Sequence, residues 1–175
     1  MKATEDGEKA LNENKISTLD VFIYKEGEDA CAHYQRIVPV DGMTRYGISK
    51  NRSAFAENTG YSVYVVANAG TAAAGAMSLA ELKAAVVAQA LNPDAVQTDL
   101  LMDGKSIATV LNDGTKANKN IDVSLKRGVA KIRVNLSYGA DYQPAGQVTK
   151  TLVNYASDAR VLETGDVLST DPATT

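Results

Sequence analysis

The clearest hydrophobic pattern in the chain lies in residues 122–138, DVSLKRGVAKIRVNLSY. From residue 130 to residue 138, small or apolar side chains alternate with polar ones. The apolar set is Ala130, Ile132, Val134, Leu136 and Tyr138, and the polar set is Lys131, Arg133, Asn135 and Ser137. A period of two is typical of a strand with one buried and one solvated face. This segment is therefore predicted to be the strongest strand and to organise a sheet.

Other segments carry the same type of signal. Residues 16–24 place Leu19, Val21 and Ile23 on one face, while Phe22 and Tyr24 cover part of the other. Residues 61–68 are apolar on both faces, which predicts a central strand. Further strands are expected at residues 33–40, 106–111, 120–125 and 148–155. Turns are expected at residues 25–29 and 112–114, and a bulge or bend is expected at Gly128. Residues 45–58 are expected to form a loop or an irregular strand.

One helix is predicted. Ser78 followed by Glu81 forms a capping box, in which each side chain accepts a hydrogen bond from the backbone of the other residue. The helix is expected to run from Leu79 to about Leu91 and to stop before Pro93. Its apolar face would be Leu79, Leu82, Val86 and Ala90. Residues 94–105 are expected to form a connection with a short buried run, Leu100, Leu101 and Met102.

These elements predict an all-β fold, a two-sheet β-sandwich with one short helix in a crossover, because a doubly wound α/β fold would need several helices. The expected organisation is a flexible lead at residues 1–14, one sandwich domain at residues 15–156, and a tail or linker at residues 157–175.

Composition narrows the function classes. The net charge is −3 and the basic residues are scattered, so neither a nucleic-acid surface nor a membrane surface is indicated. A single cysteine excludes an internal disulfide. The amino terminus is polar and shows no export signal, which fits either a cytoplasmic protein or the mature or trimmed form of an exported one.

Candidate sites for chemistry each lack a required part. Residues 70–75, GTAAAG, have the glycine spacing of a phosphate loop, but Ala76 and Met77 stand where Lys and Ser or Thr are needed. His33 and Cys31 are expected to point to the same face of a strand, with no partner that would make them catalytic. We therefore predict no nucleotide site and no nucleophile–base pair.

The same holds for metal, carboxylate and nucleic-acid chemistry. Residues 112–120 offer oxygen ligands, but Lys116 and Lys119 intrude, and Ser124 stands at the twelfth position from Asp113, where a calcium loop needs Glu. Asp99 and Asp103 are read as solvated loop residues and not as a catalytic pair. The densest basic cluster, which lacks interleaved aromatic residues, is Lys126, Arg127, Lys131 and Arg133. No catalytic residue, metal ligand or cofactor is predicted.

Five segments together resemble a known family. They are, in chain order, KISTLDVFIY, VYVVAN, SLAELK, LLMDGK and LKRGVAKIRVNL. This ordered set resembles the amino-terminal domain of the fimbrillins, the type V pilus subunits of Bacteroidales, over residues 15–155. The resemblance implies a transthyretin-like, seven-stranded sandwich, export as a lipoprotein precursor, and assembly into fimbriae at the cell surface and outer membrane.

In that family a protease, often arginine-specific, removes an amino-terminal strand, and a strand from a neighbouring subunit fills the groove by strand addition. This chain departs from the whole-protein pattern, because it has no lipid-bearing cysteine or signal, no arginine before Arg36 and no second sandwich domain after Tyr155. A mature or trimmed amino-terminal domain, monomeric in isolation, would explain these differences. The alternative is a surface sandwich that binds a glycan or a host protein without polymerising.

Overall fold

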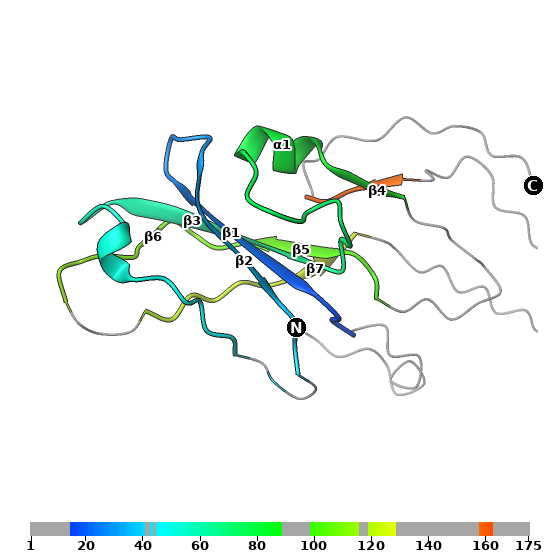
Figure 1. Ribbon diagram of the computed structural model, residues 1–175, viewed down its shortest axis with the longest axis horizontal. Coiled ribbons are helices and arrows are strands. Elements are labelled where there is room, and N and C mark those ends of the chain that lie inside the picture. Colours follow the sequence, from blue (N-terminus) through cyan, green and yellow to red (C-terminus); the bar gives the residue numbers. More distant parts are fainter. Residues whose placement is uncertain are drawn as a thin grey trace, which may run out of the picture.

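The computed structural model describes residues 15–40, 43, 45–88, 99–115, 119–128 and 158–162. Its centre is an antiparallel sheet with the order β2-β1-β3-β5-β7, in which β6 also pairs with β3 (Figure 1). A second, two-stranded antiparallel sheet joins β4 and β8. The bounds are β1 Leu19–Lys25, β2 Cys31–Ile37, β3 Gly60–Ala67, β4 Val86–Ala88, β5 Met102–Lys105, β6 Thr109–Val110, β7 Lys126–Arg127, β8 Asp158–Arg160 and the helix α1 Leu79–Ala84. The prediction of an all-β, sandwich-like fold with one short helix is confirmed.

The two longest strand pairings follow directly from the alternation in the sequence. β1 pairs with β3 from Leu19, opposite Ala67, to Lys25, opposite Tyr61. The predicted central position of β3 is confirmed, since β1 lies on one side of it and both β5 and β6 on the other. We call the two sides of this sheet face A and face B. Face A carries Phe22, Tyr24, Tyr64 and Val66, and face B carries Leu19, Val21, Ile23 and Val63.

Two predictions are wrong for the strands that pair with β3 on the side away from β1. β5 lies in the stretch expected as a connection, although its buried run is confirmed. Residues 106–111 and 120–125 do not form a hairpin, because β6 pairs with β3 and residues 120–125 carry no strand. The physical reason lies at Ser106, whose N–H donates to the Val63 carbonyl at 2.9 Å and whose hydroxyl accepts from the Val63 N–H at 3.0 Å. The chain therefore follows β3 from β5 into β6.

The start of the helix is as predicted, but its end is not. The Ser78 hydroxyl accepts from the Glu81 N–H at 3.1 Å, and the Glu81 carboxylate accepts from the Ser78 N–H at 2.7 Å. The helix ends at Ala84, whereas we expected it to reach Leu91. Ala85 is extended, and Val86–Ala88 forms β4 against β8. Valines are restricted in a helix and well suited to a strand, so pairing across the chain determines the conformation here.

Face A is covered by regular elements. Leu82 of α1 and the alanines of the segment before it pack onto Phe22 and Tyr24, and the chain around β4 and β8 adds Val161 and Leu162, which are buried. These two residues belong to the stretch expected as a tail from residue 157. In the structure the tail does not begin there, because an apolar pair completes the core cluster at this point.

Face B is covered by irregular segments, residues 45–58, 111–115 and 119–125 (Figure 1). Their apolar side chains meet the sheet at Tyr46, Ile48, Phe55, Leu111, Ile121 and Leu125. Close contact requires a glycine in β5, since a Cβ on Gly104 would lie 2.4 Å from the Ser124 carbonyl oxygen. The stretch at residues 45–58, expected as loop or irregular strand, contains a short 3-10 helix, Arg52–Ala54.

Three predictions concern chain outside the described residues: the lead at 1–14, the strand at 148–155 and the alternating part of the strongest strand, 130–138. Within the described part of that segment, β7 pairs with β5 and the Gly128 N–H donates to the Leu101 carbonyl at 2.9 Å.

Candidate functional site

The central sheet has two edge strands among the described residues, β2 and β7, and β2 is the longer of the two. Among the described residues, β2 pairs with β1 alone, so β2 is an edge strand. Its register shifts once, since Ile23 lies opposite His33 while Tyr24 lies opposite Cys31, which leaves Ala32 as the extra residue of a bulge. Edge strands offer backbone donors and acceptors to other strands, and bulges limit that tendency.

A buried ionic cluster fixes this edge strand to the sheet. The carboxylate of Asp20 in β1 is fully buried and accepts two hydrogen bonds from the Arg36 guanidinium, at 2.7 and 2.9 Å. The Tyr34 hydroxyl donates to the same carboxylate at 2.7 Å. Arg36 also donates to the Gly70 carbonyl at 2.5 Å. Sequence reasoning missed this cluster, although a carboxylate inside the apolar run TLDVFIY was a signal that it needed a charged partner.

The bulge in β2 corrects the prediction for Cys31 and His33. Paired residues share a face, so Cys31 lies on face A with Tyr24, and His33 lies on face B with Ile23. The Cys31 thiol donates to the His33 carbonyl at 3.1 Å, and burial raises the pKa of this thiol. Burial lowers the pKa of His33, partly opposed by a hydrogen bond with Gln35, and its Nε2 atom has no partner among the described residues. The two side chains therefore do not form one site.

The glycine-rich segment at residues 70–75 is a packed connector. Gly70 and Gly75 have φ values of +59° and +93°, which favour glycine, and Ala73 between them is fully buried against face A. The Tyr24 hydroxyl donates to the Met77 carbonyl at 3.0 Å. This segment serves to bring the chain from β3 to α1.

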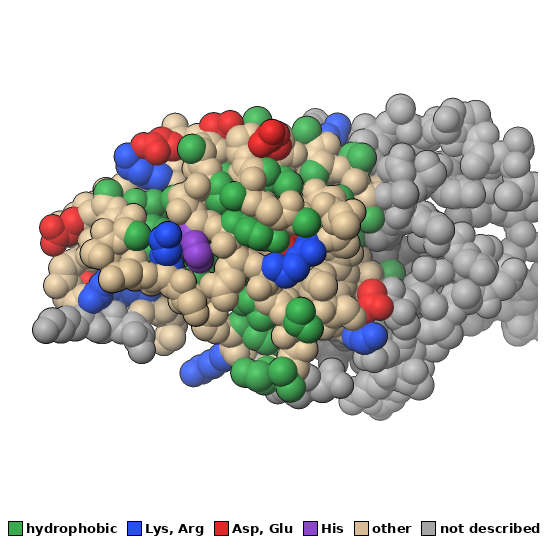
Figure 2. Space-filling view, in the orientation of Figure 1, with side chains coloured by type: hydrophobic (Ala, Val, Ile, Leu, Met, Phe, Trp, Pro, Cys, Tyr) green, Lys and Arg blue, Asp and Glu red, His purple; other side chains and the backbone are tan. Residues whose placement is uncertain are grey.

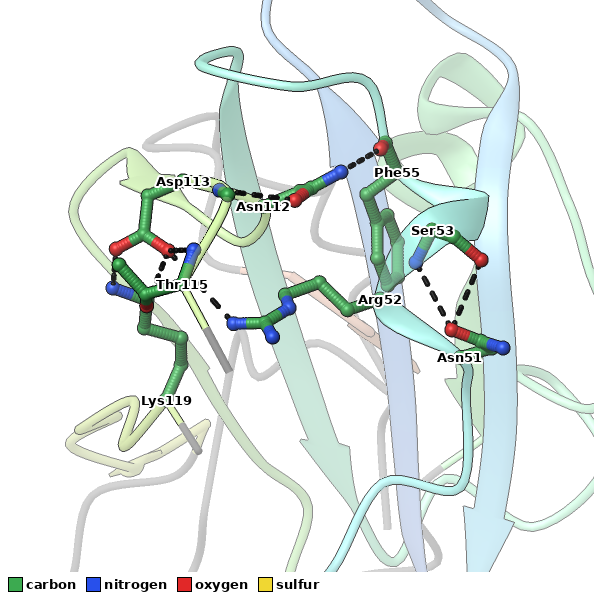
Figure 3. A network of polar contacts seen from close by, with 9 residues as sticks. Asn51, Arg52, Ser53, Phe55, Asn112, Asp113, Thr115 and Lys119 are labelled. Atoms are coloured by element: carbon green, nitrogen blue, oxygen red, sulfur yellow. Dashed lines mark hydrogen bonds and ion pairs between the residues drawn. The ribbon is translucent and has the colours of Figure 1, made fainter. Parts of the chain in front are cut away.

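The loop after β6 is closed by its own hydrogen bonds (Figure 3). The Asp113 carboxylate contacts Lys119, accepts from the Thr115 N–H at 3.0 Å and lies 3.8 Å from Arg52. The Lys119 ammonium, followed by Thr115, holds the pKa of Asp113 well below its usual range. The Asn112 side chain donates to the Phe55 carbonyl at 2.9 Å. The loop thus contacts the 51–58 segment through Arg52 and Phe55, and the Asp113 carboxylate is already neutralised by Lys119.

Asp99 and Asp103 lie in different surroundings. Asp99 accepts from the Ser17 hydroxyl at 2.5 Å and lies 3.6 Å from the Lys15 ammonium. Asp103 is a half-buried residue of β5, opposite Val66, and not the loop residue that we expected. Of the predicted basic cluster, Lys126 and Arg127 form β7, and Lys131 and Arg133 lie outside the described residues.

One shallow groove of about 290 Å³ lies beside the turn between β1 and β2. Its charged groups are largely paired, since Lys25 contacts Glu28, and Glu26 contacts Ser62. The Lys105 ammonium lies 5.2 Å from the centre of the Tyr64 ring. Acidic and basic side chains are dispersed over the face shown in Figure 2.

The described part of the chain shows neither a metal-binding cluster nor a membrane-spanning helix. It contains no group of three or more His, Cys, Asp or Glu residues that could hold a metal ion. No helix in it is long and apolar enough to span a membrane.

Two solved structures show similarity to this chain. The chain has similarity to the solved structure of a fimbrial assembly protein from Parabacteroides distasonis, with 18% identity, a TM-score of 0.46, and coverage of 65% of this chain and 46% of that one. For a protein assigned to cell adhesion from Bacteroides eggerthii, the identity is 27%, the TM-score 0.43, and the coverage 63% of this chain and 33% of that one. The chain thus spans less than half the length of either. No curated protein matches it.

The family model gives the assignment. The model of the family described as major fimbrial subunit protein (FimA) matches residues 1–158, which is most of the chain. This match confirms the resemblance found in the five segments of the sequence. The chain therefore belongs to the major fimbrial subunit protein family.

Proposed function

We propose that this chain is the amino-terminal domain of a structural subunit of a cell-surface fimbria, and that it joins neighbouring subunits by strand addition. The family match over residues 1–158 carries this proposal. We assign the domain no catalytic role, and we propose that it is exported, that the whole subunit reaches the outer membrane, and that the isolated domain is monomeric.

The architecture supports strand addition in physical terms. An antiparallel sheet with an edge strand can accept another strand through backbone hydrogen bonds, with specificity from alternate side chains. Here β2 is such an edge among the described residues, and the ion pair between Arg36 and the buried Asp20 keeps it attached to β1. A sheet that remains intact at its edge is suited to a subunit that must join other subunits.

Immunogold electron microscopy tests the proposed function. Antibodies raised against the purified 175-residue protein would be applied to intact cells of the source bacterium and to cells in which the gene is deleted. We expect gold particles along surface fibres of the parent cells, and both labelling and fibres absent from the deletion strain.

Antibody absorbed beforehand with the purified protein is the control for specific labelling. Label spread over the cell surface with no fibres would overturn the fimbrial proposal and favour a recognition module that binds a glycan or a host protein. Labelling confined to the cell interior would contradict both.

A further inference from the structure

Residues 45–49 follow a strand-like pattern without belonging to any strand. Tyr46 and Ile48 are half-buried and pack onto face B, while Arg45, Gly47 and Ser49 are exposed. This alternation is what a strand in the second layer of a sandwich would show. Among the described residues, however, no backbone–backbone hydrogen bond joins the 45–49 segment to a strand.

One side chain takes the place of the missing ladder. Gln35 in β2 lies opposite Val21 and therefore projects from face B. Its amide nitrogen donates to the Gly47 carbonyl at 3.2 Å, and its amide oxygen accepts from the Ser49 N–H at 2.8 Å. A carbonyl and an N–H that flank one residue are the groups an extended chain presents to a neighbouring strand. Gln35 thus binds the backbone of an extended segment, whatever side chains that segment carries.

The surface around this segment is apolar. Beneath it lie Leu19, Val21, Ile23 and the partly buried Ile37 and Val65. The chain that leads into it exposes three large side chains, Val38 at 73%, Val40 at 64% and Met43 at 52%. A second chain that contacts Val38, Val40 and Met43 would cover this exposed apolar surface, and where it replaces residues 45–49 it would also cover the strip on face B.

We propose that the 45–49 segment is an internal substitute for a strand from a second copy of this protein, and that its release opens the strip on face B to that strand. The inference rests on the proposed function and adds the place and the control of one subunit contact. The 45–49 segment is held by the side chains of Tyr46 and Ile48 and by the Gln35 amide, so its opening requires less free energy than the opening of β1 or β3. In a fimbria the neighbouring chain is another subunit, and a strand with large apolar side chains at alternate positions would fit the strip that Tyr46 and Ile48 now occupy.

The test compares two variants of the 175-residue chain by sedimentation velocity and amide hydrogen exchange. Gln35→Ala removes both hydrogen bonds to the 45–49 segment. We expect the Ser49 amide to exchange at least tenfold faster than in the parent protein, and association to appear at a concentration at least tenfold lower. A synthetic peptide with the sequence of residues 43–50, MTRYGISK, should suppress that association, whereas the same peptide with Ser in place of Tyr46 and Ile48 should not.

Asn112→Ala is the matched control. It removes an amide that holds another irregular segment on the same face, through the Phe55 carbonyl, and leaves the 45–49 segment in place. We expect this variant to remain monomeric at the concentrations where Gln35→Ala associates. Equal association of both variants would mean general destabilisation and would overturn the inference.

A second variant that detaches the 45–49 segment keeps the test decisive if Gln35→Ala does not fold. The double substitution Tyr46→Ser and Ile48→Ser removes the apolar anchors, which are only half-buried, and should give the same association. A protein that stays monomeric with an unprotected Ser49 amide would overturn the inference, as would unchanged Ser49 protection in Gln35→Ala. If one of these results were obtained and immunogold labelling still showed labelled fibres, the inference about the 45–49 segment would be wrong and the proposed fimbrial function would remain supported. The association test and the immunogold test therefore fail independently.

Discussion

The two faces of the central sheet are covered in different ways. Face A is covered by α1, β4 and β8, together with the alanine-rich connector, and face B by irregular segments (Figure 1). Regular elements satisfy their own backbone groups, whereas irregular chain must find other partners. On face B those partners include the side-chain amides of Gln35 and Asn112 and the Tyr61 hydroxyl, which accepts from the Ala56 N–H at 2.9 Å. The comparison shows that similar apolar surfaces can be closed either by secondary structure or by irregular chain held by a few polar side chains.

The difference between the two faces should have its largest effect on the free energy of unfolding when one apolar side chain is removed from the segments that cover each face. Leu82→Ala empties a fully buried site on face A, and we expect a loss of about 4 kcal/mol in the free energy of unfolding. Ile48→Ala on face B removes a half-buried side chain and should cost about 1 kcal/mol. Urea denaturation measures both, and equal losses would show that the two covers are equally tight.

The Asp20 cluster is the polar counterpart of that test on face A. In the described part of the chain, Arg36→Ala leaves the buried Asp20 carboxylate with the hydrogen bond from the Tyr34 hydroxyl. Because Arg36 is itself about a third exposed, we expect a loss of about 2–3 kcal/mol by urea denaturation.

Lys25→Ala removes an exposed ion pair with Glu28 and is the control, for which no change in the urea midpoint is expected. If Arg36→Ala also left the midpoint unchanged, Asp20 would not depend on its guanidinium partner.

Gly104→Ala tests how closely the irregular cover approaches face B. The added Cβ would lie 2.4 Å from the Ser124 carbonyl oxygen and 2.9 Å from Val123, so the 123–124 segment must move. We expect a loss of about 2 kcal/mol by urea denaturation. Gly47→Ala is the matched control, since nothing lies within 4 Å of its Cβ position, and it should have little effect.

The smallest effect is a pH dependence at His33. Burial lowers the pKa of His33 in the folded protein, so the unfolded chain binds the proton more readily. Stability from this residue is complete above the unfolded pKa, near 6.5, and is lost as the pH falls through the folded pKa. The melting temperature of the parent protein should fall more between pH 7 and pH 5 than that of His33→Gln. Parallel curves for the two proteins would contradict this assignment.

The sequence predicted the parts of the fold that depend on local pattern. The alternation in residues 16–24, the apolar run at 61–68 and the Ser78–Glu81 capping box all correspond to structure. It did not predict β4, because Val86 and Val87 follow a helix pattern and become a strand only when β8 pairs with them. The face of His33 was also missed, since a bulge has no simple signature in one strand. Gln35 gave no signal, because its role depends on backbone groups far along the chain.

The pairing of β4 with β8 also has a consequence for the order of folding. β1, β2 and β3 are successive strands within residues 19–67, whereas Val86 meets Arg160 across 74 positions of the chain (160 − 86). Contacts between distant positions carry a larger entropic cost of loop closure and form late. We therefore expect the three strands β2, β1 and β3 to assemble first and β8 to close face A last. During folding, Phe22 and Tyr24 would then stay partly uncovered until Val161 and Leu162 pack against them.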